Sequence, residues 1–303
     1  MKTILITGGT GLIGKHLAPM LKEKGYKLHL LSRNSKPVFP YDAVFTWNYK
    51  TGTIDKAAFK GVTHIIHLAG AGIADQNWTH ARKIEILQSR VNTAALLLDC
   101  LKAQSIQLEA FIGGSAFGWY GAQTETLLHT EIEPAAADFM GETCRVWERA
   151  ADLFENIAKR VVKIRTGVVL AKEGGALPKM MEPFKYHFGA ALGTGKQQIP
   201  WIHLEDICKV FMEAIENERY TGPINAVATE ECTNKAFSRT LATVLGKSLL
   251  PLPVPSFVIK LIFGEMSAVV LEGTRVSNAK LRNLGFKFSF EELGGAIRNL
   301  LKK

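Results

Sequence analysis

Apolar residues follow two different periods along the first half of the chain. Short runs of isoleucine, leucine and valine predict strands, and longer stretches with apolar positions three or four residues apart predict helices. The predicted strands cover residues 2–7, 27–32, 43–46, 64–68, 110–114 and 160–166, the last continuing to 170. Helices are predicted between them over 11–24, 79–103 and 138–157. This alternation predicts an α/β fold, a doubly wound parallel sheet of the Rossmann type.

Beyond residue 172 the alternation becomes irregular. The pattern predicts a helix over 178–188 that Pro183 breaks, then a short strand at 200–203 that leads into a helix. Further helices are predicted over 233–245, 256–263 and 290–301. We therefore expect a dinucleotide-binding domain in residues 1–172, continued by about 198–228. Residues 173–197 and 229–303 are then a smaller α+β portion that binds the substrate.

The first strand runs into three glycines with the spacing Gly8-x-x-Gly11-x-x-Gly14, and a helical pattern begins at once. Gly8 permits a sharp turn, Gly11 permits close approach of a pyrophosphate, and Gly14 lets the helix pack tightly on the strand. The helix N-terminus adds free N–H groups and a partial positive charge. An ordinary glycine turn is the alternative, but the position between strand and helix favours a dinucleotide site that also includes Thr10, Leu12 and Ile13.

Ser32 and Arg33 end the second strand, without a carboxylate nearby. At this position an acidic residue binds the 2′-hydroxyl of NAD, whereas an arginine accommodates the 2′-phosphate of NADP. The planar guanidinium of Arg33 suits a phosphate. The sequence therefore predicts NADP(H), and a solvated loop arginine is the alternative.

Two further strands deliver candidate side chains to the same edge of the sheet. Ser115 follows the strand at 110–114, and Tyr120 follows in a tight loop, where it could act on a substrate carbonyl or hydroxyl. The alternative is that Tyr120 only forms a wall of the pocket. Within the long helix, Glu85 and Arg90 could reach the cofactor, and a surface ion pair is the alternative.

The amino-acid composition narrows the classes of molecule that the chain is expected to bind. The net charge is +9, but the basic residues are scattered, which favours a basic surface around an anionic cofactor over nucleic-acid binding. No apolar run is long enough to cross a membrane. The four cysteines are too far apart for a zinc site or a disulfide framework, and a reducing cytoplasm is expected. His64 and His67 point to opposite faces of a strand, so no metal site is predicted.

With the glycine turn, an ordered set of motifs resembles the atypical epimerase-family branch of the extended short-chain dehydrogenase/reductase superfamily. Members of that branch are catalogued as nucleoside-diphosphate-sugar epimerases, and some as cell-division inhibitors. The resemblance covers essentially the whole chain. The motifs are Leu68-Ala69-Gly70, Trp78-Thr79, Ser89-Arg90, Ser115 with Tyr120-Gly121, Trp147-Glu148, the segment 165–170, and Trp201-Ile202-His203 with Asp206.

The resemblance implies an NADP(H)-binding fold. It implies that Ser32 and Arg33 lie at the adenosine phosphate and that Leu68, Ala69 and Gly70 follow the cofactor. It also supports Glu85 and Arg90 as cofactor contacts, and places Val168 near the nicotinamide.

One feature of the superfamily is missing. Active members use a tyrosine and, four residues later, a lysine that lowers the pKa of the phenol. None of the six tyrosines here is followed by a lysine at that spacing, and the expected place in residues 139–144 has Thr143 or Cys144 instead.

Two functions stay open. The chain is an NADP-dependent oxidoreductase or epimerase with Ser115 and Tyr120 as catalytic residues and a small polar substrate, such as a nucleotide-sugar. Alternatively it is a catalytically degenerate NADPH-binding regulator or sensor. The sequence leaves the oligomeric state open.

Overall fold

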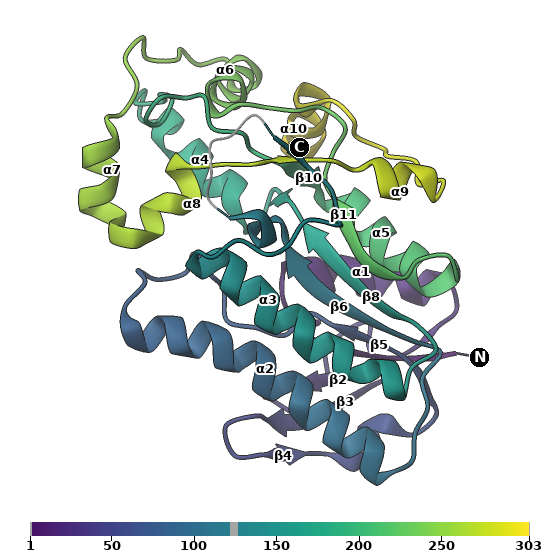
Figure 1. Cartoon of the computed structure of the whole chain (residues 1–303). Coiled ribbons are helices and arrows are strands. Elements are labelled where there is room, and N and C mark those ends of the chain that lie inside the picture. The colour runs from purple at the N-terminus through teal and green to yellow at the C-terminus, as the bar shows by residue number, and fades with distance from the viewer. Residues whose placement is uncertain (1, 122–126, 303) are drawn as a thin grey trace.

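Eight strands form one sheet within the part of the chain that the computed structural model describes, residues 2–121 and 127–302. The neighbours run β11-β8-β6-β5-β1-β2-β3-β4 across the sheet (Figure 1). All adjacent pairs are parallel except β3 and β4. The strands are β1 (Thr3–Thr7), β2 (Lys27–Ser32), β3 (Ala43–Asn48), β4 (Thr53–Ile54), β5 (Val62–His67), β6 (Ala110–Ala116), β8 (Val161–Thr166) and β11 (Gly222–Ala226).

Helices cover both faces of this sheet. The helices α2 (His80–Ala103) and α3 (Phe139–Asp152) lie side by side across one face, and η3 (Leu153–Asn156) extends α3 (Figure 1). On the other face α1 (Leu12–Glu23) packs against α5 (Leu204–Glu216). Each face has its own apolar core, and the two cores contain the buried apolar side chains of the central strands β1, β5 and β6.

A second layer lies beyond the carboxyl ends of the central strands (Figure 1). It contains a two-stranded parallel sheet of β9 (Val168–Leu170) and β10 (Trp201–His203). The helices α4 (Ala176–Lys185), α6 (Asn234–Leu245) and α10 (Leu293–Leu301) pack around a separate core that includes Trp201 and Phe237. The core of this layer is separate from the two cores of the main sheet.

Short elements complete the described chain. Two of them, β7 and β12, pair in parallel beside the edge strand β11. The complete set of these short elements is η1 (Lys56–Phe59), η2 (Phe117–Tyr120), β7 (Leu128–His129), α7 (Ser256–Phe263), η4 (Gly264–Ser267), α8 (Ala268–Leu271), β12 (Arg275–Val276) and α9 (Ala279–Asn283).

The predicted doubly wound parallel sheet is confirmed, with several corrections. The strand predicted through residue 170 ends at Thr166. At Gly167 the chain passes close to the Pro200 carbonyl, where a Cβ would lie 2.7 Å from the oxygen. Residues 168–170 then pair with β10 instead of the main sheet. Pro183 does not break α4, which continues past it to Lys185, so only the hydrogen bond of one missing N–H near the helix end is lost. The strand β11 was not predicted, because it begins Gly-Pro, and an edge position accommodates that proline.

The predicted division into two units stays a prediction. The described chain does return to the main sheet through α5 and β11. The strands β9 and β10, however, which that division assigns to the dinucleotide-binding unit, contribute Leu170 and Trp201 to the separate core.

Candidate functional site

A cavity of about 850 Å³ opens at the carboxyl edge of the main sheet. The strand order reverses between β1 and β5, and the segments that follow these two strands both line the cavity. Open α/β sheets bind ligands in such a crevice. Of the predicted cofactor residues, the lining includes Gly8, Thr10, Gly11, Ser32, Arg33, Leu68, Ala69, Gly70 and Glu85, whereas Leu12, Ile13, Gly14, Arg90 and Val168 lie outside it.

Two of the three glycines are required by close backbone packing. Gly8 has a φ of +69°, and a Cβ there would lie 2.7 Å from the carbonyl carbon of Leu68. At Gly14 a Cβ would lie 2.5 Å from the Cα of Gly9. Gly11 caps α1 and donates its N–H to the Gly8 carbonyl at 2.9 Å. The turn therefore holds the start of α1 against the end of β5, with the helix N-terminus at the cavity.

Basic side chains stand at the end of β2. Arg33 and Lys36 line the cavity and are exposed. Among the described residues, Arg33 has no hydrogen bond or ion pair with another side chain. Its guanidinium is free to meet an anionic ligand, which fits the predicted phosphate contact.

A buried histidine supports the floor of the crevice. His67 ends β5, and its Nδ1 lies 2.7 Å from Thr7 Oγ1 while Nε2 lies 3.2 Å from Thr93 Oγ1. Both threonines are buried, and Thr93 also lines the cavity. Burial, with a smaller contribution from Arg90, lowers the pKa of His67 to about 3. The imidazole is therefore neutral and structural, on the opposite side of the strand from His64.

Glu85 and Arg90 take different positions. Glu85 lines the cavity and accepts a hydrogen bond from Arg82 Nη1 at 2.7 Å. Arg90 is buried beneath it, donates to the Ala71 carbonyl at 3.0 Å, and lies 4.5 Å from the ring of Trp147. Arg82, which also lines the cavity, was missed by the sequence reasoning, although its spacing from Glu85 on a helix predicts such a pair.

Ser115 and Tyr120 belong to one buried polar network. Ser115 Oγ donates to Glu148 Oε1 at 2.7 Å, and the same carboxylate accepts from Arg165 Nε at 2.8 Å. Arg165 Nη1 donates to the Tyr120 hydroxyl at 3.0 Å, and that hydroxyl donates to Asn225 Oδ1 at 2.7 Å. The network joins β6, α3, β8 and β11, and Tyr120 is 3% exposed. The phenol therefore points into the protein, and neither Tyr120 nor Ser115 lines the crevice.

Burial also acts on the remaining candidates for proton transfer. It raises the pKa of Tyr120 to about 12, although Arg165 opposes the shift. It raises the pKa of Cys144 to about 12 as well, and the Cys144 thiol donates to the Ala116 carbonyl at 3.6 Å. Neither group exchanges protons readily near neutral pH. Cys144, one of the two residues at the expected lysine position, is thus a buried, protonated thiol.

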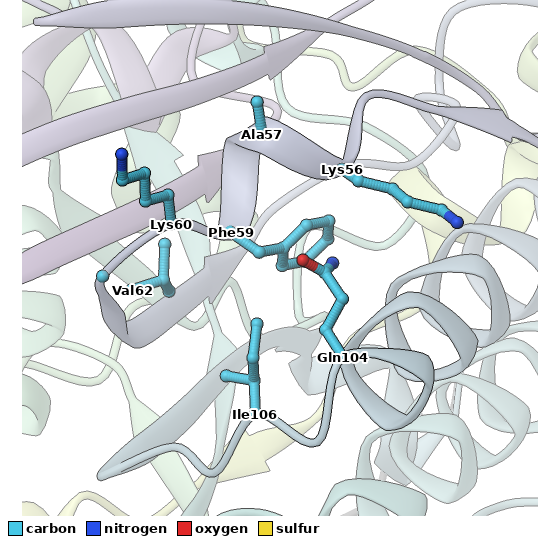
Figure 2. A pocket seen from close by; sticks show the side chains of 8 residues that line it. Lys56, Ala57, Phe59, Lys60, Val62, Gln104 and Ile106 are labelled. Atoms are coloured by element: carbon cyan, nitrogen blue, oxygen red, sulfur yellow. The ribbon is translucent and has the colours of Figure 1, made fainter.

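A second hollow lies at the opposite edge of the sheet, near the start of β5. Figure 2 shows Phe59 and Gln104 next to each other, with Lys56 and Lys60 extending away on either side. The hollow has a volume of about 600 Å³ but contains no carboxylate, histidine or cysteine. Its position at the amino ends of the strands separates it from the crevice.

Comparison with known proteins identifies the family. Residues 4–226 match the NAD dependent epimerase/dehydratase family. The chain belongs to this family. Residues 254–300 also match a domain of unknown function, DUF1731. The chain is 33% identical over 298 residues to the epimerase family protein YfhF of Bacillus subtilis (strain 168), with 98% of this chain and 97% of the relative covered.

Solved structures of family members are also similar. The human epimerase family protein SDR39U1 (isoform 2), crystallised with NADPH, gives a TM-score of 0.87 at 30% identity, with 98% of each chain covered. A nucleoside-diphosphate sugar epimerase from Corynebacterium glutamicum gives 0.79 at 30% identity, covering 99% of this chain and 58% of that one. MoeE5 in complex with UDP-glucuronic acid and NAD gives 0.78 at 17% identity, which shows the shared fold.

The described residues contain no metal-ligand cluster, no disulfide and no helix that could span a membrane. Among them, no three of the histidines, cysteines, aspartates and glutamates are grouped as metal ligands. All four cysteines are free and buried. Within the same ranges, none of the helices combines the length and hydropathy of a membrane span.

His67 makes stability sensitive to acid. Its pKa is about 3 in the folded protein and near 6.5 in the unfolded chain, so the unfolded chain alone takes up this proton below pH 6.5. The stabilisation is complete above pH 6.5 and falls as the pH decreases. We expect His67→Gln to reduce the loss of unfolding free energy between pH 7.5 and 5.5 by about 1.4 kcal/mol. Urea titrations at both pH values measure this loss, and an equal loss in both proteins would contradict the assignment.

Proposed function

We propose that this chain binds NADP(H) in the crevice and acts as an NADP(H)-dependent oxidoreductase or epimerase-like protein on a small polar substrate. The observation that carries the proposal is the cavity of about 850 Å³ at the strand reversal, lined in part by Arg33, which has no side-chain partner among the described residues. The human relative crystallised with NADPH supports the choice of cofactor.

The residues present fit such a cofactor. The backbone turn at Gly8 leaves no room for a Cβ and brings the α1 N-terminus to the cavity, so the pyrophosphate would be held there. Ser32 and Arg33 would hold the 2′-phosphate, and Leu68, Ala69 and Gly70 would support the nucleotide along the end of β5. A bound nicotinamide supplies or accepts the hydride.

The substrate belongs to a broad chemical class in this proposal. A nucleotide-sugar is one member of it, because several structures of the same fold were determined with such ligands. Their identity to this chain is 17%, so they support the fold and leave the substrate to experiment. Ser115 is the proposed residue that orients the reacting oxygen, and Tyr120 is the other candidate from the sequence.

A specific observation favours a second candidate function, that of an NADPH-binding regulator or sensor. The hydroxyls of Ser115 and Tyr120 are both engaged in the buried network, and the pKa of Cys144 is raised. A site built in this way binds cofactor without a group that exchanges protons at neutral pH.

Arg33→Asp tests the choice of cofactor. We expect it to weaken NADPH binding about 10- to 100-fold, because charge-assisted contacts to the 2′-phosphate are lost and repulsion is added. NADH binding should change little. Isothermal titration calorimetry measures both affinities, and Arg239→Asp on the exposed side of α6 is a control with the same change in charge. An equal loss for NADPH and NADH would show that Arg33 does not contact the phosphate.

Ser115→Ala and Tyr120→Phe separate catalysis from structure. We expect Ser115→Ala to slow turnover while NADPH affinity stays the same. Tyr120→Phe should instead cost about 1–3 kcal/mol of stability, because Asn225 and Arg165 lose a buried partner. Steady-state kinetics and chemical unfolding of the same preparations measure the two effects. A catalytic loss in Tyr120→Phe at unchanged stability would favour the phenol as the acid.

Turnover assays distinguish the two candidate functions. The purified protein is mixed with NADPH and, separately, with NADP⁺, across a panel of carbonyl compounds, alcohols and nucleotide-sugars. The enzyme proposal expects a change in nicotinamide absorbance, or an epimerised product detected by chromatography. Tight NADPH binding without either signal would support the regulator.

A further inference from the structure

The loop after β5 is held in an unusual way. Residues 70–75, here called the strap, line the crevice with Gly70, Ala71, Gly72 and Asp75. Four consecutive carbonyl groups of the strap each accept a hydrogen bond from a side chain. The pairs are Arg90 Nη1 to Ala71 at 3.0 Å, Arg82 Nη2 to Gly72 at 2.6 Å, Trp78 Nε1 to Ile73 at 2.8 Å and Lys179 Nζ to Ala74 at 3.3 Å.

The four donors come from different parts of the fold. Arg82 and Arg90 belong to α2, and Trp78 precedes that helix. Lys179 belongs to α4, in the layer beyond the main sheet. Because the donors are distributed in this way, the position of the strap depends on both layers of the molecule.

Arg82 and Trp78 are themselves fixed by further contacts, whereas Lys179 reaches the strap from an exposed position on α4. The Arg82 side chain is only 10% exposed and also pairs with Glu85. The Trp78 ring packs edge-on against Phe139 at 4.8 Å, and Lys83 Nζ lies 5.1 Å from the centre of the same Phe139 ring. Lys83 also forms an ion pair with Glu265 of η4, which is a second connection from α2 to the C-terminal region.

This arrangement leaves the other backbone groups of the strap open to a ligand. Ser89 Oγ accepts the Ala71 N–H at 2.9 Å, but no hydrogen bond within the described chain engages the N–H groups of residues 72–74. The carbonyl groups, which would repel phosphate or ribose oxygens, are directed to the cationic and indole donors instead. A loop ordered before binding loses less entropy when the ligand arrives.

We propose that Trp78 and Lys179 are positioning residues for the cofactor: they hold the strap against the crevice, so retention of the dinucleotide depends on α4 as well as on the sheet. This inference rests on the proposed NADP(H) binding. Neither residue lines the cavity, and both act through the strap backbone.

Two substitutions remove single donors with little change in packing. Trp78→Phe deletes the indole N–H and keeps an aromatic ring beside Phe139, while Lys179→Met keeps the length of the side chain without its charge. We expect each to raise the NADPH dissociation constant about 2- to 10-fold through faster dissociation, since each loses one hydrogen bond. Lys179→Arg, which restores a donor, should recover wild-type affinity.

A matched control and a second readout keep the test specific. Lys172 also donates to a backbone carbonyl, that of Lys302 at 3.2 Å, but it has no contact with the strap. Lys172→Met should therefore leave NADPH affinity unchanged. Hydrogen exchange of the strap amides should become faster in Trp78→Phe and Lys179→Met, while the cofactor-free unfolding midpoint stays within about 2 °C of wild type.

The outcomes separate the inference from the proposal on which it rests. Wild-type protein that binds no NADPH overturns the proposed function and the inference together. Wild-type protein that binds, with Trp78→Phe and Lys179→Met binding equally well, overturns only the inference. A loss of affinity that accompanies an equal loss in Lys172→Met, or a lowered unfolding midpoint, also overturns it.

Discussion

The close approach of two backbones, at the ends of β1 and β5, sets the geometry of the rest. Gly8 turns with a positive φ directly against Leu68, and only a residue without a Cβ leaves enough space. The turn sends the chain into α1, whose N-terminus then lies at the point where the strand order reverses. Because parallel strands end at one edge, β2 brings Ser32 and Arg33 to the same crevice, and the loop after β5 becomes its opposite wall.

The other end of the site is organised by a buried ion pair. Glu148 and Arg165 are each 2% exposed, and their hydrogen bonds reach Ser115 and Tyr120. Removing two charges from water is expensive, so such a pair persists only where further hydrogen bonds satisfy it. Here those bonds connect four elements and use the hydroxyls that the superfamily resemblance offers for catalysis. The same hydrogen bonds that hold this network together therefore limit the proton chemistry of Ser115 and Tyr120.

Local patterns in the sequence pointed to many residues that line the crevice, but not to the contacts of Ser115 and Tyr120. Glycine spacing, an arginine after the second strand and small residues after the strand at 64–68 are local patterns, and each has a local physical reason. The strand β11 and the engaged state of Tyr120 are not local, because both depend on partners more than 50 residues away in the chain, such as Arg165 for β11 and Asn225 for Tyr120. Arg90 shows the intermediate case: its helix was predicted, but its hydrogen bonds to the carbonyls of Ala71 and Ile86 were not.

The amino-acid sequence by itself determined the parallel sheet, the glycine turn and the basic character of the position after β2, since periodicity and residue type control these features within a few positions. Only the tertiary structure decided which polar groups are free. Arg33 has no side-chain partner among the described residues, while Arg90, Ser115 and Tyr120 are all engaged in hydrogen bonds. The physical reason is that a hydrogen bond depends on distances between segments, and these distances exist only after the layers have packed.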